Sequence, residues 1–221
     1  MHKNIISASI LAADFAHLGD EAKDALDAGA DYIHFDVMDH HFVPNLSFGA
    51  VICQSLRKAG ITAPIDVHLM VEHPEAYIKP FADAGATLLT FHPETVKSVE
   101  ETLHKIRDVG LKTGLAFNPE NPLDIDPEIL KELDLILLMS VNPGFAGQSF
   151  IAGSLDKIAS TRQLLKKINS KAMLGIDGGI KTGNIGEVAK AGADFFVVGS
   201  GLFHAKNYDE EIAKMRKQLS S

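Results

Sequence analysis

The chain has 221 residues, of which 46% are hydrophobic and 23% charged, enough for one large domain with a full apolar core. Its formal net charge of −8 argues against a nucleic-acid-binding protein, and no apolar run is long enough to span a bilayer. The single cysteine, Cys53, cannot form an internal disulfide, and the first residues lack a signal-peptide pattern, so we expect a cytoplasmic protein.

Eight short apolar runs predict β-strands. They are Ile5–Ala8, Tyr32–Val37, Ile65–Leu69, Leu88–Phe91, Thr113–Phe117, Leu135–Met139, Met173–Ile176 and Phe195–Val198. Amphipathic stretches between them predict helices, for example Asp14–Ala28, Pro74–Ala84, Val96–Val109, Leu155–Ile168 and Gly183–Ala191. Several of the strands are almost continuously apolar, as strands buried on both faces are.

A short motif repeats along the chain. Its near copies, Ala28–Asp31, Ala84–Thr87 and Ala191–Asp194, each follow a predicted helix and precede a predicted strand. Glycine just past a helix end is a common stop signal. Strict alternation of strand and helix predicts a parallel sheet, and eight such units in this length predict an α/β fold with a closed (β/α)8 barrel. We expect one domain, residues 1–221.

Histidine and aspartate alternate in two of these strands. His34 and Asp36 share one face of their strand, and Asp66 and His68 share one face of the next, because residues two apart in a strand point the same way. Imidazole and carboxylate ligands on adjacent buried strands suit a divalent metal, and Asp177 could complete the site. Asp66 lies one layer deeper than His68, so we expect it to support a ligand or fill the barrel.

Other polar residues also fall at strand ends, where the active sites of such barrels lie: Ser9, His92, Asn118 and Ser140. For His92 a structural and a functional role remain equally open. Met38 and Met70 each lie two residues past a proposed ligand, and we expect them to cover the site. Met139 could either cover the site or fill the core.

Glycines mark a candidate phosphate site. The pairs Gly178-Gly179 and Gly199-Ser200 follow the seventh and eighth strands, whose loops commonly bind phosphate in barrels of this kind. We expect a bulky residue at Gly178 or Gly199 to weaken phosphate binding without disturbing the fold. The glycine-rich loop over residues 142–149 is interpreted as a lid, with a rigid connection as the alternative.

Long residue strings carry a resemblance to a known family. They are Ser7–Asp14, Ile33–Asn45, Asp66–Met70, Met139–Gln148, Ile176–Gly179 and Gly199-Ser200. On these strings the chain resembles the ribulose-phosphate 3-epimerases over essentially its whole length. The resemblance implies a ribulose-phosphate-binding (β/α)8 barrel, or TIM barrel, and an isomerase of the pentose phosphate pathway. It also implies a divalent metal and reversible epimerisation of ribulose 5-phosphate and xylulose 5-phosphate at carbon 3.

The resemblance assigns roles residue by residue. The metal ligands fall on His34, Asp36, His68 and Asp177, and the two acid/base residues on Asp36 and Asp177. The substrate contacts fall on Ser9, His68, Gly144, Phe145, Ala146, Gly147, Asp177, Gly178, Gly179, Gly199 and Ser200. Two imidazoles and two carboxylates suit Zn²⁺, Fe²⁺, Mn²⁺ or Co²⁺. We also expect a homo-oligomer, since such barrels often assemble.

Two residues depart from the family pattern: His40 stands where glycine or asparagine is frequent, and Ala146 where glycine is common. Ala146 also occurs in the related allulose-6-phosphate 3-epimerases, so a six-carbon substrate remains an alternative. The related decarboxylases use an Asp-x-Lys-x-x-Asp string, which this sequence lacks. A non-catalytic sugar-phosphate-binding barrel is the third alternative, and the presence of both Asp36 and Asp177 argues against it.

Overall fold

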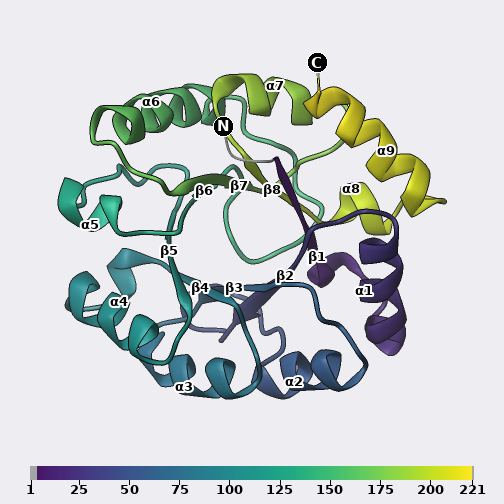
Figure 1. Ribbon diagram of the computed structural model, residues 1–221, viewed down its shortest axis with the longest axis horizontal. Helices are drawn as coiled ribbons and strands as arrows, with labels where there is room; N and C mark the ends of the chain where they lie inside the picture. The colour runs from purple at the N-terminus through teal and green to yellow at the C-terminus, as the bar shows by residue number, and fades with distance from the viewer. Residues whose placement is uncertain (1–3, 221) are drawn as a thin grey trace.

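The protein is an eight-stranded parallel barrel surrounded by helices (Figure 1). The computed structural model describes residues 4–220. The strands are β1 Ile5–Ser9, β2 Tyr32–Met38, β3 Ile65–Met70, β4 Leu88–Phe91, β5 Lys112–Phe117, β6 Leu135–Met139, β7 Met173–Asp177 and β8 Phe195–Val198. Each strand pairs in parallel with the next, and β8 pairs with β1, which closes the barrel predicted from the sequence.

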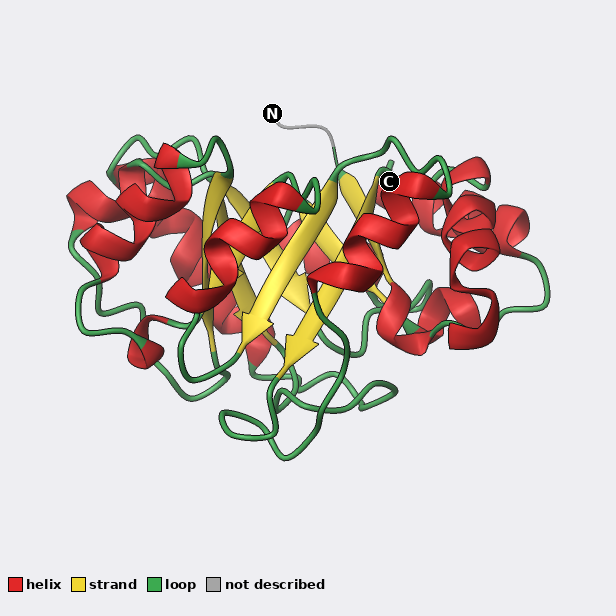
Figure 2. Ribbon diagram, turned by 90° about the horizontal axis from the view of Figure 1, so that it is seen from below, coloured by secondary structure: helices red, strands yellow, loops and turns green. Residues whose placement is uncertain are grey.

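The helices form the outer layer. They are α1 Leu18–Asp27, α2 Ala50–Lys58, α3 Glu75–Asp83, α4 Val99–Asp108, α5 Pro127–Lys131, α6 Ser154–Lys167, α7 Ile185–Ala191, α8 Ser200–Phe203 and α9 Tyr208–Leu219. Figure 2 shows the strands running toward one end of the barrel, from which long loops extend. None of the helices in residues 4–220 is long and apolar enough to cross a membrane.

Two of the predicted helices, α1 and α4, begin four and three residues later than expected. The Asp14 carboxylate accepts a hydrogen bond from the Ala16 amide and starts a 3₁₀ turn over 15–17, so the α-helix begins only at Leu18. Ser98 accepts a hydrogen bond from the Glu101 amide and is the N-cap of α4, which excludes residues 96–98. Ser98 therefore caps α4 directly, whereas Asp14 caps the 3₁₀ turn that precedes α1.

The repeated motif has a structural explanation. Its glycines, Gly29, Gly85 and Gly192, have φ values of 109°, 87° and 125°, in the left-handed region that favours glycine. Its last residue accepts an amide hydrogen bond from the neighbouring strand in all three copies: Ile6 to Asp31, Ile65 to Thr87 and Leu174 to Asp194. An arginine from an adjacent helix donates to each glycine carbonyl: Arg216 to Gly29, Arg57 to Gly85 and Arg162 to Gly192. The repeat therefore ties each helix end to the barrel.

Alternation along β2 and β3 separates the core from the barrel interior. Residues 33, 35, 37, 65, 67 and 69 belong to the large apolar core between the strands and the helices. The intervening residues face the interior in matched pairs, since His34 lies beside Asp66, Asp36 beside His68 and Met38 beside Met70. A second apolar cluster from other strands fills the interior: Leu88, Ala116, Leu135, Leu137, Phe195 and Val197. A polar layer therefore lies within an otherwise apolar barrel.

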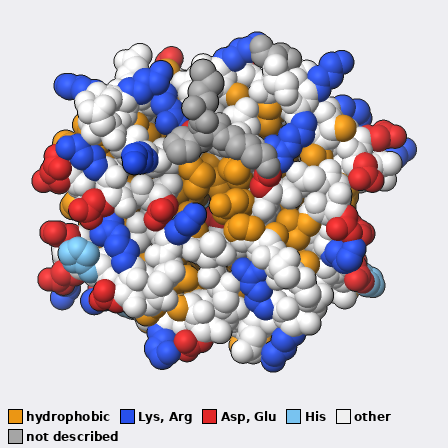
Figure 3. Space-filling model, viewed as in Figure 1, with side chains coloured by type: hydrophobic (Ala, Val, Ile, Leu, Met, Phe, Trp, Pro, Cys, Tyr) orange, Lys and Arg blue, Asp and Glu red, His pale blue; other side chains and the backbone are white. Residues whose placement is uncertain are grey.

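On the face of the molecule shown in Figure 3, positively and negatively charged side chains are mixed. Figure 3 shows Lys and Arg side chains interspersed with Asp and Glu around this face, and apolar side chains near its centre. Charged side chains of both signs are therefore mixed on this face of a chain whose net charge is −8.

Candidate functional site

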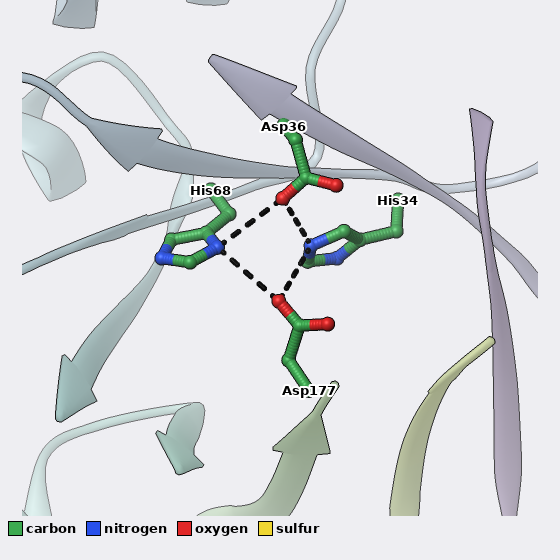
Figure 4. Close-up of side chains that lie close together, drawn as sticks. All are labelled: His34, Asp36, His68 and Asp177. Carbon is green, nitrogen blue, oxygen red and sulfur yellow. Dashed lines mark hydrogen bonds and ion pairs between the residues drawn. The ribbon is translucent and has the colours of Figure 1, made fainter. Parts of the chain in front are cut away.

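Four side chains from three strands converge inside the barrel. His34 and Asp36 come from β2, His68 from β3 and Asp177 from the last position of β7. One potential ligand atom from each residue lies within 4.8 Å of the other three, and Figure 4 shows these atoms pointing toward a common centre. We call these four residues the His–Asp cluster; they are the four that the sequence predicted as metal ligands.

The spacing within the His–Asp cluster suits a metal ion. The His34 Nε2 atom lies 3.1 Å from Asp36 Oδ1 and 3.7 Å from Asp177 Oδ2. The His68 Nδ1 atom lies 3.4 Å from Asp36 Oδ1 and 3.6 Å from Asp177 Oδ2. Two ligands at about 2.1 Å from one ion lie roughly 3.0–3.4 Å apart, so only small movements would bring all four into coordination distance. This donor set could hold a divalent cation.

Burial and charge act in opposite directions on these groups. Burial lowers the pKa of His34, but the carboxylates of Asp36 and Asp66 outweigh it and hold the pKa well above its ordinary value. Burial also raises the pKa of Asp36, but His34 and His68 outweigh it, and the net pKa is lowered. The histidines therefore favour the ionised form of the Asp36 carboxyl group.

Three neighbouring side chains contact the cluster. Ser9, the last residue of β1, donates its hydroxyl to Asp36 Oδ2 at 2.7 Å. Asp66 Oδ2 lies 2.6 Å from His34 Nδ1, which agrees with the supporting position expected for Asp66. His68 Nε2 lies 2.9 Å from Nε2 of His92, a contact that the sequence did not predict.

A cavity opens at the carboxyl ends of the strands, directly beside the cluster. Its empty volume is about 530 Å³, including the part open to solvent. Asp36 and Asp177 both line it, and their side chains are 6% and 15% exposed. His34 and His68 are fully buried and are not among the lining residues, so the two carboxylates are the members of the cluster that face the cavity.

The cavity gathers nearly all of the residues predicted to contact substrate. Those of the predicted set that line it are Ser9, Gly144, Phe145, Ala146, Gly147, Asp177, Gly178, Gly179, Gly199 and Ser200. Of the predicted set only His68 is outside the lining. Met38, Met70 and Met139 also line the cavity, so the methionines expected to cover the site do border it.

The expectation about replacing Gly178 needs correction. A Cβ atom at Gly178 would lie 2.5 Å from Val141 Cγ2, and its φ of 119° disfavours other residues, so a bulky side chain there would disturb the loop. Gly199 differs, because its nearest contact for an added Cβ is Ala12 Cβ at an ordinary 3.4 Å. Gly178 therefore has a structural role whether or not it contacts a ligand.

The glycine-rich loop over 142–149 is held in place by polar contacts. Gln148 donates to the carbonyls of Asn142 and Phe145 at 2.6 and 3.0 Å, and Asn45 donates to the Gly144 carbonyl at 2.8 Å. Phe145 remains 57% exposed at the edge of the cavity. The loop therefore closes one side of the cavity in an ordered conformation.

The two departures from the family pattern differ in conformation. His40 is exposed and has a φ of 62°, which explains why glycine or asparagine suits the position. Ala146 lines the cavity and is not among the left-handed residues within 4–220, so its methyl group is accommodated without backbone strain.

Some lining residues were not predicted: Leu11, Val141, Ile180 and Val197. Val197 could have been found, because it lies two residues before Gly199 and shares the inward face of β8 with Phe195. Leu11 lies in a short 3₁₀ turn after β1, and Val141 and Ile180 lie in loops after β6 and β7, where side-chain direction does not follow a simple period.

The sequence is similar to that of a known protein family and of named relatives. Residues 5–203 match the ribulose-phosphate 3 epimerase family. The ribulose-phosphate 3-epimerase of Escherichia coli strain K12 is 51% identical over 220 residues, covering 100% of this chain and 98% of that protein. That of Buchnera aphidicola subsp. Acyrthosiphon pisum is 53% identical over 219 residues, covering 99% of this chain and 96% of that protein.

Solved structures share the fold at low sequence identity. KGPDC from Streptococcus mutans gives a TM-score of 0.74 at 12% identity, covering 99% of this chain and 98% of that one. Orotidine 5'-phosphate decarboxylase from Pyrococcus horikoshii OT3 gives 0.71 at 15% identity, covering 98% of this chain and 100% of that one. These likenesses support the barrel fold.

Proposed function

The chain belongs to the ribulose-phosphate 3-epimerase family, and we propose that it interconverts D-ribulose 5-phosphate and D-xylulose 5-phosphate by moving a proton at carbon 3. The observation that carries the mechanism is the placement of Asp36 and Asp177. They extend from β2 and β7, on different sides of the barrel, and both line one cavity.

Two carboxylates facing one substrate can invert a carbon centre. The hydrogen on carbon 3 is acidified by the carbonyl at carbon 2, and its removal leaves an enediolate. Inversion requires a base on one face of that carbon and an acid on the other. We assign these roles to Asp36 and Asp177, which exchange them in the reverse reaction. The lowered pKa of Asp36 favours it as the carboxylate that begins ionised.

We propose that the His–Asp cluster binds one divalent cation per chain, with Zn²⁺, Fe²⁺, Mn²⁺ and Co²⁺ as the candidates. Such an ion, when bound, would stabilise negative charge on the substrate oxygens as a Lewis acid. The residues of the chain would do the rest: Asp36 and Asp177 carry the protons, and Ser9 orients Asp36.

The remaining cavity residues suggest how a sugar phosphate would lie. We assign the phosphate to the backbone amides around Gly178-Gly179 and Gly199-Ser200. Phe145, Ala146 and the flanking Gly144 and Gly147 would cover the sugar. The three methionines that line the cavity would exclude water from the reacting carbon.

We further propose a cytoplasmic location, a homo-oligomeric state and a single domain over residues 1–221. The buried thiol of Cys53 fits a reducing compartment. Residues 1–3 and 221 of this proposed domain lie outside the described residues.

Initial rates on two substrates test the proposal. Ribulose 5-phosphate should be epimerised with the higher kcat/KM, and the product formed in deuterated water should carry deuterium at carbon 3. A higher kcat/KM on allulose 6-phosphate would instead favour the six-carbon alternative. Binding of either sugar phosphate without exchange at carbon 3 would instead favour the non-catalytic sugar-phosphate-binding barrel.

A further inference from the structure

His68 contacts a second buried histidine through the ring nitrogen that points away from the His–Asp cluster. Its Nε2 atom lies 2.9 Å from Nε2 of His92, and the two rings meet edge to edge, with their planes inclined by 28° and their centroids 5.1 Å apart. Both side chains are fully buried. His92 directly follows β4 and precedes Pro93, so its backbone position is set by the end of that strand.

A hydrogen bond between two ring nitrogens holds a single proton, and the cluster decides where that proton lies. His68 directs Nδ1 toward Asp36 and Asp177. A nitrogen that binds a metal carries no proton, so a metal-binding His68 must keep its proton on Nε2. His68 Nε2 then donates, and His92 Nε2 must accept. A neutral His92 can accept there only if its own proton is on Nδ1.

The surroundings of His92 favour that tautomer. Its Nδ1 atom is buried and has no hydrogen-bond partner within residues 4–220, and the nearest carboxylate oxygen, Glu94 Oε1, lies 3.7 Å away. Asn118 and Asn121 each donate a side-chain amide to that oxygen at 2.9 Å, which fixes the carboxylate in place. A negative charge held beside Nδ1 stabilises a proton on Nδ1.

We propose that His92, backed by Glu94, is a positioning residue that fixes the tautomer of His68 and presents the unprotonated Nδ1 atom to the cluster. The inference rests on the proposed metal site. Each histidine of the cluster then has a partner on the ring nitrogen that points away from the cluster. Asp66 contacts that nitrogen of His34, and His92 contacts that nitrogen of His68. Partners of this kind orient ligands and tune metal affinity.

A packing role for His92 is the competing explanation, because the Phe42 ring lies against it with centroids 4.8 Å apart. Two substitutions separate packing from hydrogen bonding. His92→Phe keeps an aromatic ring but removes the acceptor. His92→Gln changes the shape but keeps an acceptor oxygen near the position of Nε2.

Cobalt titration of the metal-free proteins, followed by the visible absorption of Co²⁺, provides the measurement. We expect His92→Phe to bind Co²⁺ roughly 10–100-fold more weakly than the parent, and His92→Gln to stay close to the parent. Equal binding by His92→Phe and the parent would overturn the inference. Equal weakening in both variants would also overturn it, because shape rather than hydrogen bonding would then matter.

A second measurement needs no substitution. In the Zn²⁺-loaded parent, ¹H–¹⁵N correlation spectra of the imidazoles should show His68 protonated at Nε2 and His92 at Nδ1. The opposite tautomer at His92 would overturn the inference, even if the variants fail to fold. The cobalt titration of the parent tests the metal site itself. A parent that binds cobalt while His92 shows the wrong tautomer therefore overturns this inference alone.

Discussion

The Nδ1 atom of His34 lies 2.6 Å from Oδ2 of Asp66, and both side chains are fully buried. This contact leaves His34 Nε2 directed at Asp36 and Asp177, so the carboxylate of Asp66 determines which ring nitrogen the cluster receives. A histidine held in this way is a more basic ligand, and its ring cannot rotate away.

Replacing Asp66 should therefore weaken the cluster from outside it. Asp66→Asn keeps an oxygen that can accept from His34 but removes the negative charge. We expect about a 10-fold loss of Co²⁺ affinity, with larger losses for Asp66→Leu. Cobalt titration measures both.

A matched control is Asp134→Asn. Like Asp66, Asp134 has a hydrogen-bonded carboxylate inside the fold. Its partner is the Thr113 backbone amide at 2.9 Å, and it lies outside the cluster. The Asp134→Asn variant should unfold at a lower urea concentration than the parent but bind cobalt with the affinity of the parent. Parent-like cobalt affinity in Asp66→Leu would show that the contact with His34 only fills the barrel.

Metal affinity should rise with pH over the range in which the histidines lose their protons. Burial lowers the pKa of His34 and His68, but neighbouring carboxylates outweigh it and raise both above the ordinary value of about 6.5. A metal must displace those protons, so lowering the pH weakens binding. Calorimetric titration with Co²⁺ in two buffers of different ionisation enthalpy should reveal proton release near pH 7. Identical heats in both buffers would contradict this expectation.

The barrel could be predicted from the sequence because its signals are local. The runs at Leu88–Phe91, Leu135–Met139 and Phe195–Val198 are strands with the predicted bounds. The strands β2 and β3 each extend one residue further, since Met38 and Met70 pair across the sheet and a partner strand sets that limit. The start of α1 was misplaced because the Asp14 side chain holds a separate turn.

The membership of the His–Asp cluster was predictable for a different reason. Period-two alternation places His34 and Asp36 on the inward face, and barrel closure brings β7 with Asp177 to the same end. What alternation could not supply is which ring nitrogen each histidine presents. The contact of His92 with His68 depends on how two rings pack in three dimensions, for which a lone histidine at a strand end carries no signal.

A charge placed in the predicted phosphate site should weaken substrate binding. Ser200 lines the cavity at the start of α8, beside Gly199. Ser200→Asp puts a carboxylate where we place the phosphate, and like charges a few ångströms apart repel by several kcal/mol at most. We expect KM for ribulose 5-phosphate to rise roughly 10-fold or more, with kcat less affected.

The corresponding control is Ser55→Asp, on the exposed side of α2 and away from the cavity. It adds the same charge to the protein and should leave KM unchanged. An unchanged KM in Ser200→Asp would move the phosphate to another part of the cavity.

The arginines that donate hydrogen bonds to the glycine carbonyls of the repeated motif should contribute more to stability than surface ion pairs do. Arg162 Nη2 lies 2.6 Å from Asp194 Oδ2, with the two side chains only 18% and 12% exposed. Arg162→Met leaves Asp194 without its cation and removes the hydrogen bond to the Gly192 carbonyl. We expect the free energy of unfolding to fall by about 2–4 kcal/mol.

Urea unfolding of Arg162→Met and Arg107→Met provides the comparison. Arg107 pairs with Glu132 at 2.8 Å, but the glutamate is 63% exposed, so its loss should cost about 1 kcal/mol or less. Equal losses in the two variants would contradict a structural role for the repeat.

The assignment of Asp36 and Asp177 as opposed proton carriers makes the most specific prediction. Asp36→Asn and Asp177→Asn should each lower the epimerisation rate by roughly 10²–10⁴-fold, because each removes the proton carrier from one face of carbon 3. Each variant keeps one carboxylate, so in deuterated water it should still exchange the carbon 3 hydrogen of one epimer, and the two variants should act on opposite epimers.

Metal content must be measured in both variants, because each residue also belongs to the His–Asp cluster and loss of a ligand would imitate loss of a base. Asp83→Asn, on the exposed end of α3 where the carboxylate pairs only with Lys79 among the contacts described, serves as the handling control and should keep the parent rate. If metal-loaded Asp177→Asn epimerises at the parent rate, Asp177 serves only the metal and the acid must be another group. If both variants exchange the hydrogen of the same epimer, the two carboxylates do not face opposite sides of the substrate.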